Sequence, residues 1–137
     1  MKSPADRVGP GVAEGVTEAM IRDVVHGFYA QVRRDPALGR IFNREIAEAD
    51  WPAHLEKMCD FWSSVLLMSG RFKGTPMAAH ARIPDIRPTH FARWLHLFRQ
   101  TAEAVCPPGA ARLFVAKSEM IAQSLQLGIA ASRGVAP

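Results

Sequence analysis

The sequence lacks the features that mark several specialised protein classes. It contains two cysteines, Cys59 and Cys106, with no CxxC motif and no metal-ligand spacing. This argues against a disulfide framework and a zinc ribbon, and it favours a reducing compartment. No apolar run approaches the roughly 18 residues of a membrane span, and residues 1–16 lack the apolar core of a signal peptide. We therefore expect a cytoplasmic protein with no membrane-spanning segment.

Charge of one sign is not concentrated anywhere in the chain. The net charge is +4, and the 17 lysines and arginines are scattered rather than grouped in blocks. A scattered basic excess favours a solvated surface over a nucleic-acid-binding face. No nucleic-acid partner is expected.

Strand signals are also missing. No segment shows period-2 alternation or enrichment in β-branched residues. The 137 residues suit one domain with a real hydrophobic core. We predict an all-α chain with a loose N-terminal arm over residues 1–16, a helical domain over 17–132 and a tail over 133–137.

Four long helices and two short ones are expected. Thr17, Asp50 and Pro88 are typical helix starts, and Asp35-Pro36 and Ser69-Gly70 are typical ends. Apolar residues recur at the spacing of a helix face in each long helix, mostly three, four or seven positions apart. In chain order these stripes are Ile21, Val25, Phe28, Val32; Trp51, Leu55, Met58, Trp62, Val65; Phe91, Trp94, Leu95, Phe98, Val105; and the adjoining pair Leu113, Met120, Leu127 with Phe114, Ile121, Leu125, Gly128. The last helix, from about Ala110 to Ser132, should be broadly buried. A short cluster, Leu38, Ile41 and Phe42, predicts a turn of helix between the first two.

The connection from Gly70 to Pro84 carries a single histidine, His80. Thr75 and Pro76 can open a helix there and Pro84 ends it, which leaves about two turns, too few to be stable alone. Such a piece is held either by packing or by a bond from His80 to a metal or cofactor, since neutral imidazole commonly binds iron, zinc and copper. A long irregular connection in a compact domain is usually functional or mobile.

Two further polar residues have two interpretations each. Tyr29 is either a core tyrosine with its hydroxyl at the rim or a hydroxyl aimed into a pocket. His54 lies beside the second apolar stripe and is either an amphipathic edge residue or projects into whatever that stripe lines. By contrast, His90 and His96 fall off the centre of the third stripe, and we expect them at the surface.

His54 and His80 are separated by 26 positions (80 minus 54), which excludes a single-helix HExxH metal site. The spacing suits two helices that hold something between them. A zinc site would need three or four nitrogen, sulfur or carboxylate ligands close together, and no such set is visible. The neighbouring large apolar residues suit a flat hydrophobic cofactor; they are Phe42, Met58, Phe61, Phe91 and Trp94.

Taken together, these segments resemble the group III truncated haemoglobins. The resemblance runs from about Thr17 to Gly128. It rests on FY at 28–29, DPALGRIF at 35–42, WPAHLEKMCDFW at 51–62, FKGTPMAAH at 72–80, HFARWLHLF at 90–98 and IAQSL at 121–125. The Gly-Gly pairs of the other two groups are absent. The resemblance implies a two-over-two helical sandwich around haem b.

The resemblance also implies a role for each matching residue. His80 matches the proximal histidine that binds the iron, and Tyr29, His54 and Trp94 match the three polar distal positions. The implied cofactor-binding set is Phe42, His54, Lys57, Met58, Phe61, His80, Arg82, Ile86, Phe91, Trp94, Ile121 and Leu125. Lys57 is the first candidate for contact with a haem propionate, and Arg71, Lys73 and Arg82 are weaker ones.

The implied function is binding and transport of O₂, or binding of CO or NO, with Tyr29 and Trp94 as hydrogen-bond donors to the ligand. The alternative on the same scaffold is a nitric oxide dioxygenase or a peroxidase-like haem enzyme. That activity needs a separate reductase as electron donor, because the sequence has no flavin or nicotinamide motif. A third interpretation is a colourless helical bundle that serves as a basic interaction module.

Overall fold

The structure is a computed structural model, and it describes residues 9–74, 83 and 86–134. The α-helices are α1 (Glu18–Arg34), α2 (Pro36–Glu45), α3 (Trp51–Leu67), α5 (Pro88–Val105) and α6 (Pro108–Ser132), with short 3-10 helices η2 (Val12–Glu14) and η3 (Glu48–Asp50). Strands are absent from these residues, so the all-α prediction is confirmed. The predicted short helix around His80 lies outside the described residues.

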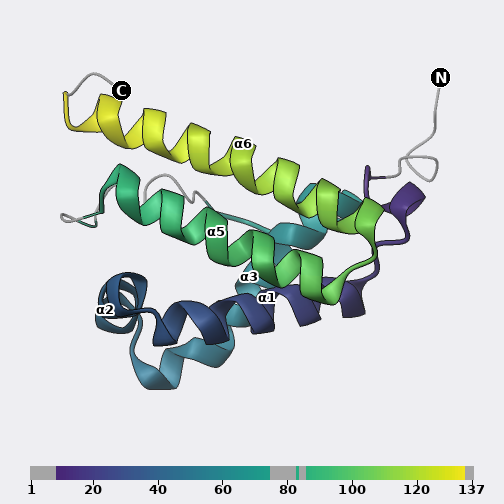
Figure 1. Cartoon of the computed structure of the whole chain (residues 1–137), viewed down its shortest axis with the longest axis horizontal. Helices are drawn as coiled ribbons and strands as arrows, with labels where there is room; N and C mark the ends of the chain where they lie inside the picture. Colours follow the sequence, from purple (N-terminus) through teal and green to yellow (C-terminus); the bar gives the residue numbers. More distant parts are fainter. Residues whose placement is uncertain (1–8, 75–82, 84–85, 135–137) are drawn as a thin grey trace.

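The helices form two packed pairs. Figure 1 shows α5 and α6 side by side, with α1 and α2 beneath α5 and α3 behind α1. Helix α1 contacts both α3 and α5, so it joins the two pairs. None of the described helices is long and apolar enough to cross a lipid bilayer.

An aromatic stack holds the two pairs together. The ring of Phe98 in α5 stacks on Trp62 of α3, with centroids 5.0 Å apart, and on Trp94 of its own helix, at 5.5 Å. Phe28 of α1 meets Phe98 edge-on at 5.1 Å, and both phenylalanines are fully buried. Removing one such buried ring typically costs about 3–5 kcal/mol of stability. The sequence stripes therefore face one another in the core, as predicted.

Side-chain caps set the helix boundaries around α1. The Thr17 hydroxyl accepts a hydrogen bond from the backbone N–H of Met20 at 3.2 Å. At the other end, Asp35 ends α1 and caps α2, and its Oδ2 accepts from the N–H groups of Ala37 and Leu38 at 3.2 and 3.0 Å. The predicted turn near Phe42 is thus a ten-residue helix.

The expectation of a loose N-terminal arm is wrong for residues 9–16. The N–H of Gly11 donates to the carbonyl of Leu66 at 2.8 Å, and Val16 is buried. A Cβ at Gly9 would lie 2.1 Å from the same carbonyl oxygen, so only glycine allows the backbone to approach α3 this closely. The segment binds through its backbone, which leaves no apolar pattern in the sequence.

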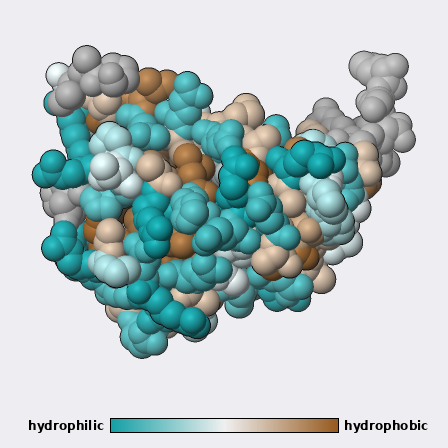
Figure 2. Space-filling model, viewed as in Figure 1, coloured by the Kyte–Doolittle hydropathy of each residue, from teal (hydrophilic) through white to brown (hydrophobic). Residues whose placement is uncertain are grey.

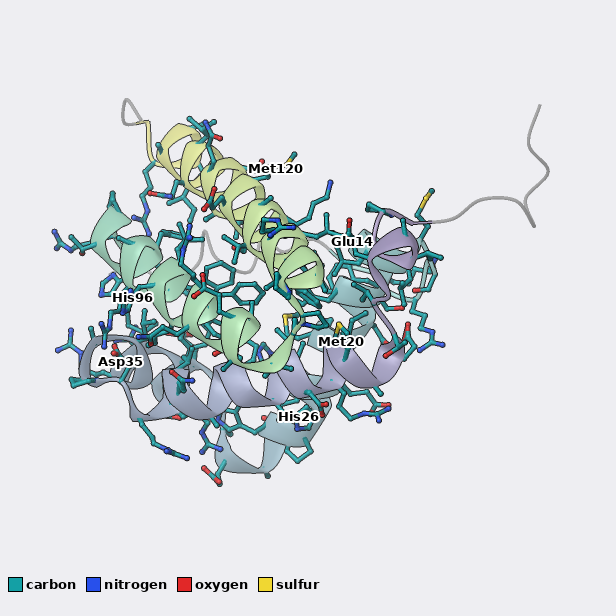
Figure 3. All side chains as sticks on the ribbon, turned by 45° about the vertical axis from the view of Figure 1, so that its right-hand side comes forward. Glu14, Met20, His26, Asp35, His96 and Met120 are labelled. Atoms are coloured by element: carbon teal, nitrogen blue, oxygen red, sulfur yellow. The ribbon has the colours of Figure 1, made fainter. Side chains whose placement is uncertain are left out.

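Helix α6 is buried on one face rather than broadly. Met120 and Leu127 of the first predicted stripe are 59% and 46% exposed. Figure 3 shows Met120 on the side of α6 that is turned away from α5. Among the described helices, α6 packs mainly against α5, so the side that carries Met120 and Leu127 stays exposed. Polar side chains cover most of the face seen in Figure 2, and apolar ones show between them.

Candidate functional site

All five described α-helices contribute side chains to the wall of one cavity, whose volume is about 210 Å³. The sequence-predicted residues on its wall are Tyr29, Phe42, His54, Lys57, Met58, Phe61, Ile86, Phe91, Trp94, Ile121 and Leu125. Residues more than 90 positions apart in the chain, such as Tyr29 and Leu125, therefore meet at one site. The remaining two predicted residues, His80 and Arg82, lie outside the described residues.

Five wall residues were not predicted: Leu38, Trp62, Phe72, His90 and Ala122. Two of them carried a usable signal, because Trp62 follows Met58 by four positions and His90 precedes Trp94 by four. Residues four apart share a helix face. Phe72 belongs to the connection after α3, and its ring meets Phe61 edge-on at 5.2 Å. No periodicity could have placed it there.

Tyr29 is held in the wall by neighbouring rings. It is 7% exposed, and its ring makes edge contacts with Phe28 at 4.9 Å and with Phe42 at 6.0 Å. Burial raises the pKa of Tyr29 well above its usual value. Its hydroxyl therefore stays protonated in neutral solution and presents a hydrogen-bond donor.

His54 lies between two aromatic rings. Its ring meets Tyr29 edge-on at 5.2 Å and Trp51 edge-on at 5.4 Å. Trp51 is itself buried, and the guanidinium carbon of Arg33 lies over the Trp51 ring, 4.6 Å from the ring centroid. These contacts orient the imidazole on the wall, so the interpretation of His54 as a pocket residue agrees with the structure.

Trp94 is fixed by the aromatic stack of the core. Its ring is parallel to Phe98 within 12° and perpendicular to Phe28, at 5.3 Å. Helix α5 thus presents the indole on the wall together with Phe91, one turn earlier. Indole Nε1–H is a donor only. Tyr29 on α1 and Trp94 on α5 are therefore candidate donors from different helices on the same wall.

His90 is a wall residue rather than a plain surface residue, which corrects the sequence expectation. Its Nδ1 accepts a hydrogen bond from the backbone N–H of Arg87 at 2.9 Å. His96, on the same helix, is exposed and absent from the wall, as expected. Figure 3 shows His96 on the outer side of α5.

Arg71, which the sequence suggested as a contact of a haem propionate, pairs with Glu18 in the structure. Its Nη1 donates to Glu18 Oε2 at 2.7 Å, and the other oxygen of Glu18 accepts from the Ser63 hydroxyl at 2.5 Å. Neither Arg71 nor Lys73 lines the cavity, whereas the exposed Lys57 does. Lys57 is therefore the basic side chain on the described wall.

The donor set suits a prosthetic group better than a protein-caged metal. Within residues 9–74, 83 and 86–134, no three side chains of His, Cys, Asp or Glu could hold a metal ion together. The wall is instead mostly aromatic and aliphatic, with a few polar atoms. Pockets of this composition bind largely apolar cofactors and orient them by those polar atoms.

Comparison with known proteins found a relative in sequence and a similar solved structure. The chain is 31% identical over 115 residues to the protein named group 3 truncated hemoglobin ctb of Campylobacter jejuni subsp. jejuni, covering 82% of this chain and 91% of that protein. The crystal structure of a group III truncated haemoglobin from Campylobacter jejuni superposes with a TM-score of 0.78 at 30% identity, with the same coverage of each chain. No protein-family model matches the sequence.

Proposed function

Since 31% identity over 82% of its length to a group 3 truncated hemoglobin shows that the chain belongs to the group III truncated haemoglobins, we propose that it binds O₂, CO or NO at the iron of haem b in this cavity. As a globin it is a haem protein. We further propose the type of haem, the ligands that it binds and the residues that contact those ligands. The observation that carries the proposal is the hydroxyl of the buried Tyr29 on an otherwise mostly apolar wall.

The wall residues fit a haem. Aromatic and aliphatic side chains from five helices would shield a flat macrocycle from water. Phe42, Phe61 and Phe91 are among them. We propose His80 as the ligand of the iron from its place in the sequence, since it lies outside the described residues. Haem iron held by one histidine supplies a further coordination position for a diatomic ligand.

Tyr29 and Trp94 would stabilise the bound ligand. Both are donors, and both lie on the cavity wall, so each can share its proton with the partial negative charge of the ligand. A net contribution of about 1 kcal/mol per hydrogen bond corresponds to about a fivefold change in an equilibrium or a rate. The two bonds should mainly slow ligand release, because affinity differences arise mostly in dissociation.

The test is the rate of O₂ dissociation from the haem-loaded, reduced protein. We expect Tyr29→Phe and Trp94→Phe each to speed dissociation about fivefold or more. His26→Ala is the control, because His26 is an exposed residue of α1 outside the cavity. If both cavity variants released O₂ at the wild-type rate, the assignment of the donors would be wrong.

A further inference from the structure

We propose that His90 is a further cofactor-binding residue, and that its Nε2–H donates a hydrogen bond to a carboxylate of the bound haem. The inference rests on the proposed function, because it requires haem in the cavity. It deepens that function by naming the residue that holds the acidic edge of the group from α5.

The backbone of α5 fixes which nitrogen of His90 carries the proton. Nδ1 accepts from the N–H of Arg87 at 2.9 Å, so in the neutral ring the proton must lie on Nε2. The contact closes the first turn of α5, where His90 is the third helical residue. The chain thus holds the ring in one tautomer, with a donor at its far end.

The position of His90 matches the polar edge of a haem. Of the polar wall residues, Tyr29 and His54 contact each other among aromatic rings. Lys57 on α3 is exposed and His90 on α5 is partly exposed, whereas the Nε2 atom of His54 is buried, so Lys57 and His90 lie nearer to solvent. The propionates are the polar, charged part of a haem, and they prefer the wet end of an apolar pocket.

His90 also has apolar neighbours on the wall. Ile86 and Phe91 are both buried there. Among the residues that the structure describes, none accepts a hydrogen bond from Nε2 of His90. A carboxylate oxygen would supply the acceptor, and a hydrogen bond to a charged group is stronger than a neutral one.

The experiment compares haem loss from two loaded forms of the protein. One form carries haem b, and the other carries its dimethyl ester, in which the carboxylates are blocked. Haem loss is followed by transfer to an excess of an apoglobin acceptor. His90→Asn keeps a short side chain that can accept from Arg87 but removes the far donor. His90→Gln restores an N–H at about the position of Nε2. His96→Asn is the matched control on the same helix, outside the cavity.

We expect His90→Asn to lose haem b about tenfold faster than wild type. His90→Gln should recover part of that difference, and His96→Asn should match wild type. With the dimethyl ester, the difference between His90→Asn and wild type should be much smaller, because an ester carbonyl accepts a weaker hydrogen bond than a carboxylate.

Two results would overturn the inference while the proposed function stands. One is an unchanged rate of haem b loss in His90→Asn. The other is an equal acceleration with haem b and with the ester, which would mean that His90 acts only through the structure of α5. Failure of the wild-type protein to take up haem b would overturn the proposed function together with this inference.

Discussion

The ring of Tyr29 meets the ring of His54 edge-on, with centroids 5.2 Å apart and planes at 85°. The two residues come from α1 and α3, and Trp51 contacts both of them. The three rings therefore pack α1 against α3 beside the polar residues of the cavity wall. These contacts fix the orientation of the His54 ring on the cavity wall.

The first prediction is that His54 controls access to the cavity. His54→Leu replaces a ring that lies on the wall with a smaller, more flexible side chain, so CO should associate several-fold faster. Flash photolysis of the CO complex measures this rate. His26→Leu, on the exposed face of α1, should leave the rate unchanged. A wild-type association rate and an unchanged ferric spectrum in His54→Leu would rule out a gating role.

The second prediction concerns the ionisation of Tyr29, which is the only tyrosine of the chain. Burial raises its pKa above the ordinary value of about 10, so the ultraviolet absorbance of tyrosinate should not develop in the native protein near pH 11. The raised pKa also means that Tyr29 favours the folded state below pH 10 and loses this contribution as pH rises further. Tyrosinate absorbance that develops near pH 10 while the far-ultraviolet circular dichroism stays native would contradict this environment.

The third prediction concerns the ion pair between Asp35 and Arg93. The Asp35 carboxylate is buried, accepts from Arg93 Nε at 2.7 Å and caps α2. Burial alone would raise the pKa of Asp35, but the hydrogen bonds from Leu38 N–H and Arg93, with the charge of Arg93, hold it below its usual value. Asp35 therefore stabilises the fold above its unfolded-state pKa of about 4, and this stability is lost as pH falls further.

Asp35→Asn should lower the free energy of unfolding at neutral pH by about 1 kcal/mol, because it removes the charge that pairs with Arg93 while the amide oxygen can still cap α2. The difference from wild type should shrink below about pH 4. Urea unfolding at several pH values measures it, and Asp23→Asn, at an exposed position of α1, is the control. A difference that stays constant from neutral to acidic pH would mean that the charge of Asp35 does not contribute.

Sequence reasoning located the parts of the fold that depend on local chemistry. The Thr17 cap, the Asp35-Pro36 boundary and the apolar stripes through Phe28 and Phe98 are set by neighbouring residues, and the structure has them where they were predicted. The two-over-two sandwich followed from the resemblance, and it agrees with the solved relative at a TM-score of 0.78.

The errors have a common physical cause, which is that periodicity does not show which side of an element has a neighbour. Met120 belongs to a regular apolar stripe but faces away from α5. Gly9 and Gly11 pack through backbone atoms and leave no side-chain pattern. His90 precedes Trp94 by four positions and so shares its helix face, but the sequence does not show that this face borders a cavity formed with α3 and α6.

The absorption spectrum of the hemin-loaded protein is the most direct test of whether the protein binds haem and leaves a coordination position for a diatomic ligand. It should be recorded in the ferric form, after reduction with dithionite and after addition of CO, for wild type and for His80→Ala. We expect a Soret band in wild type that shifts on reduction and shifts again with CO, and a weakened and altered band in His80→Ala. A wild-type protein without a Soret band after reconstitution with hemin would contradict the proposal that the cavity holds haem.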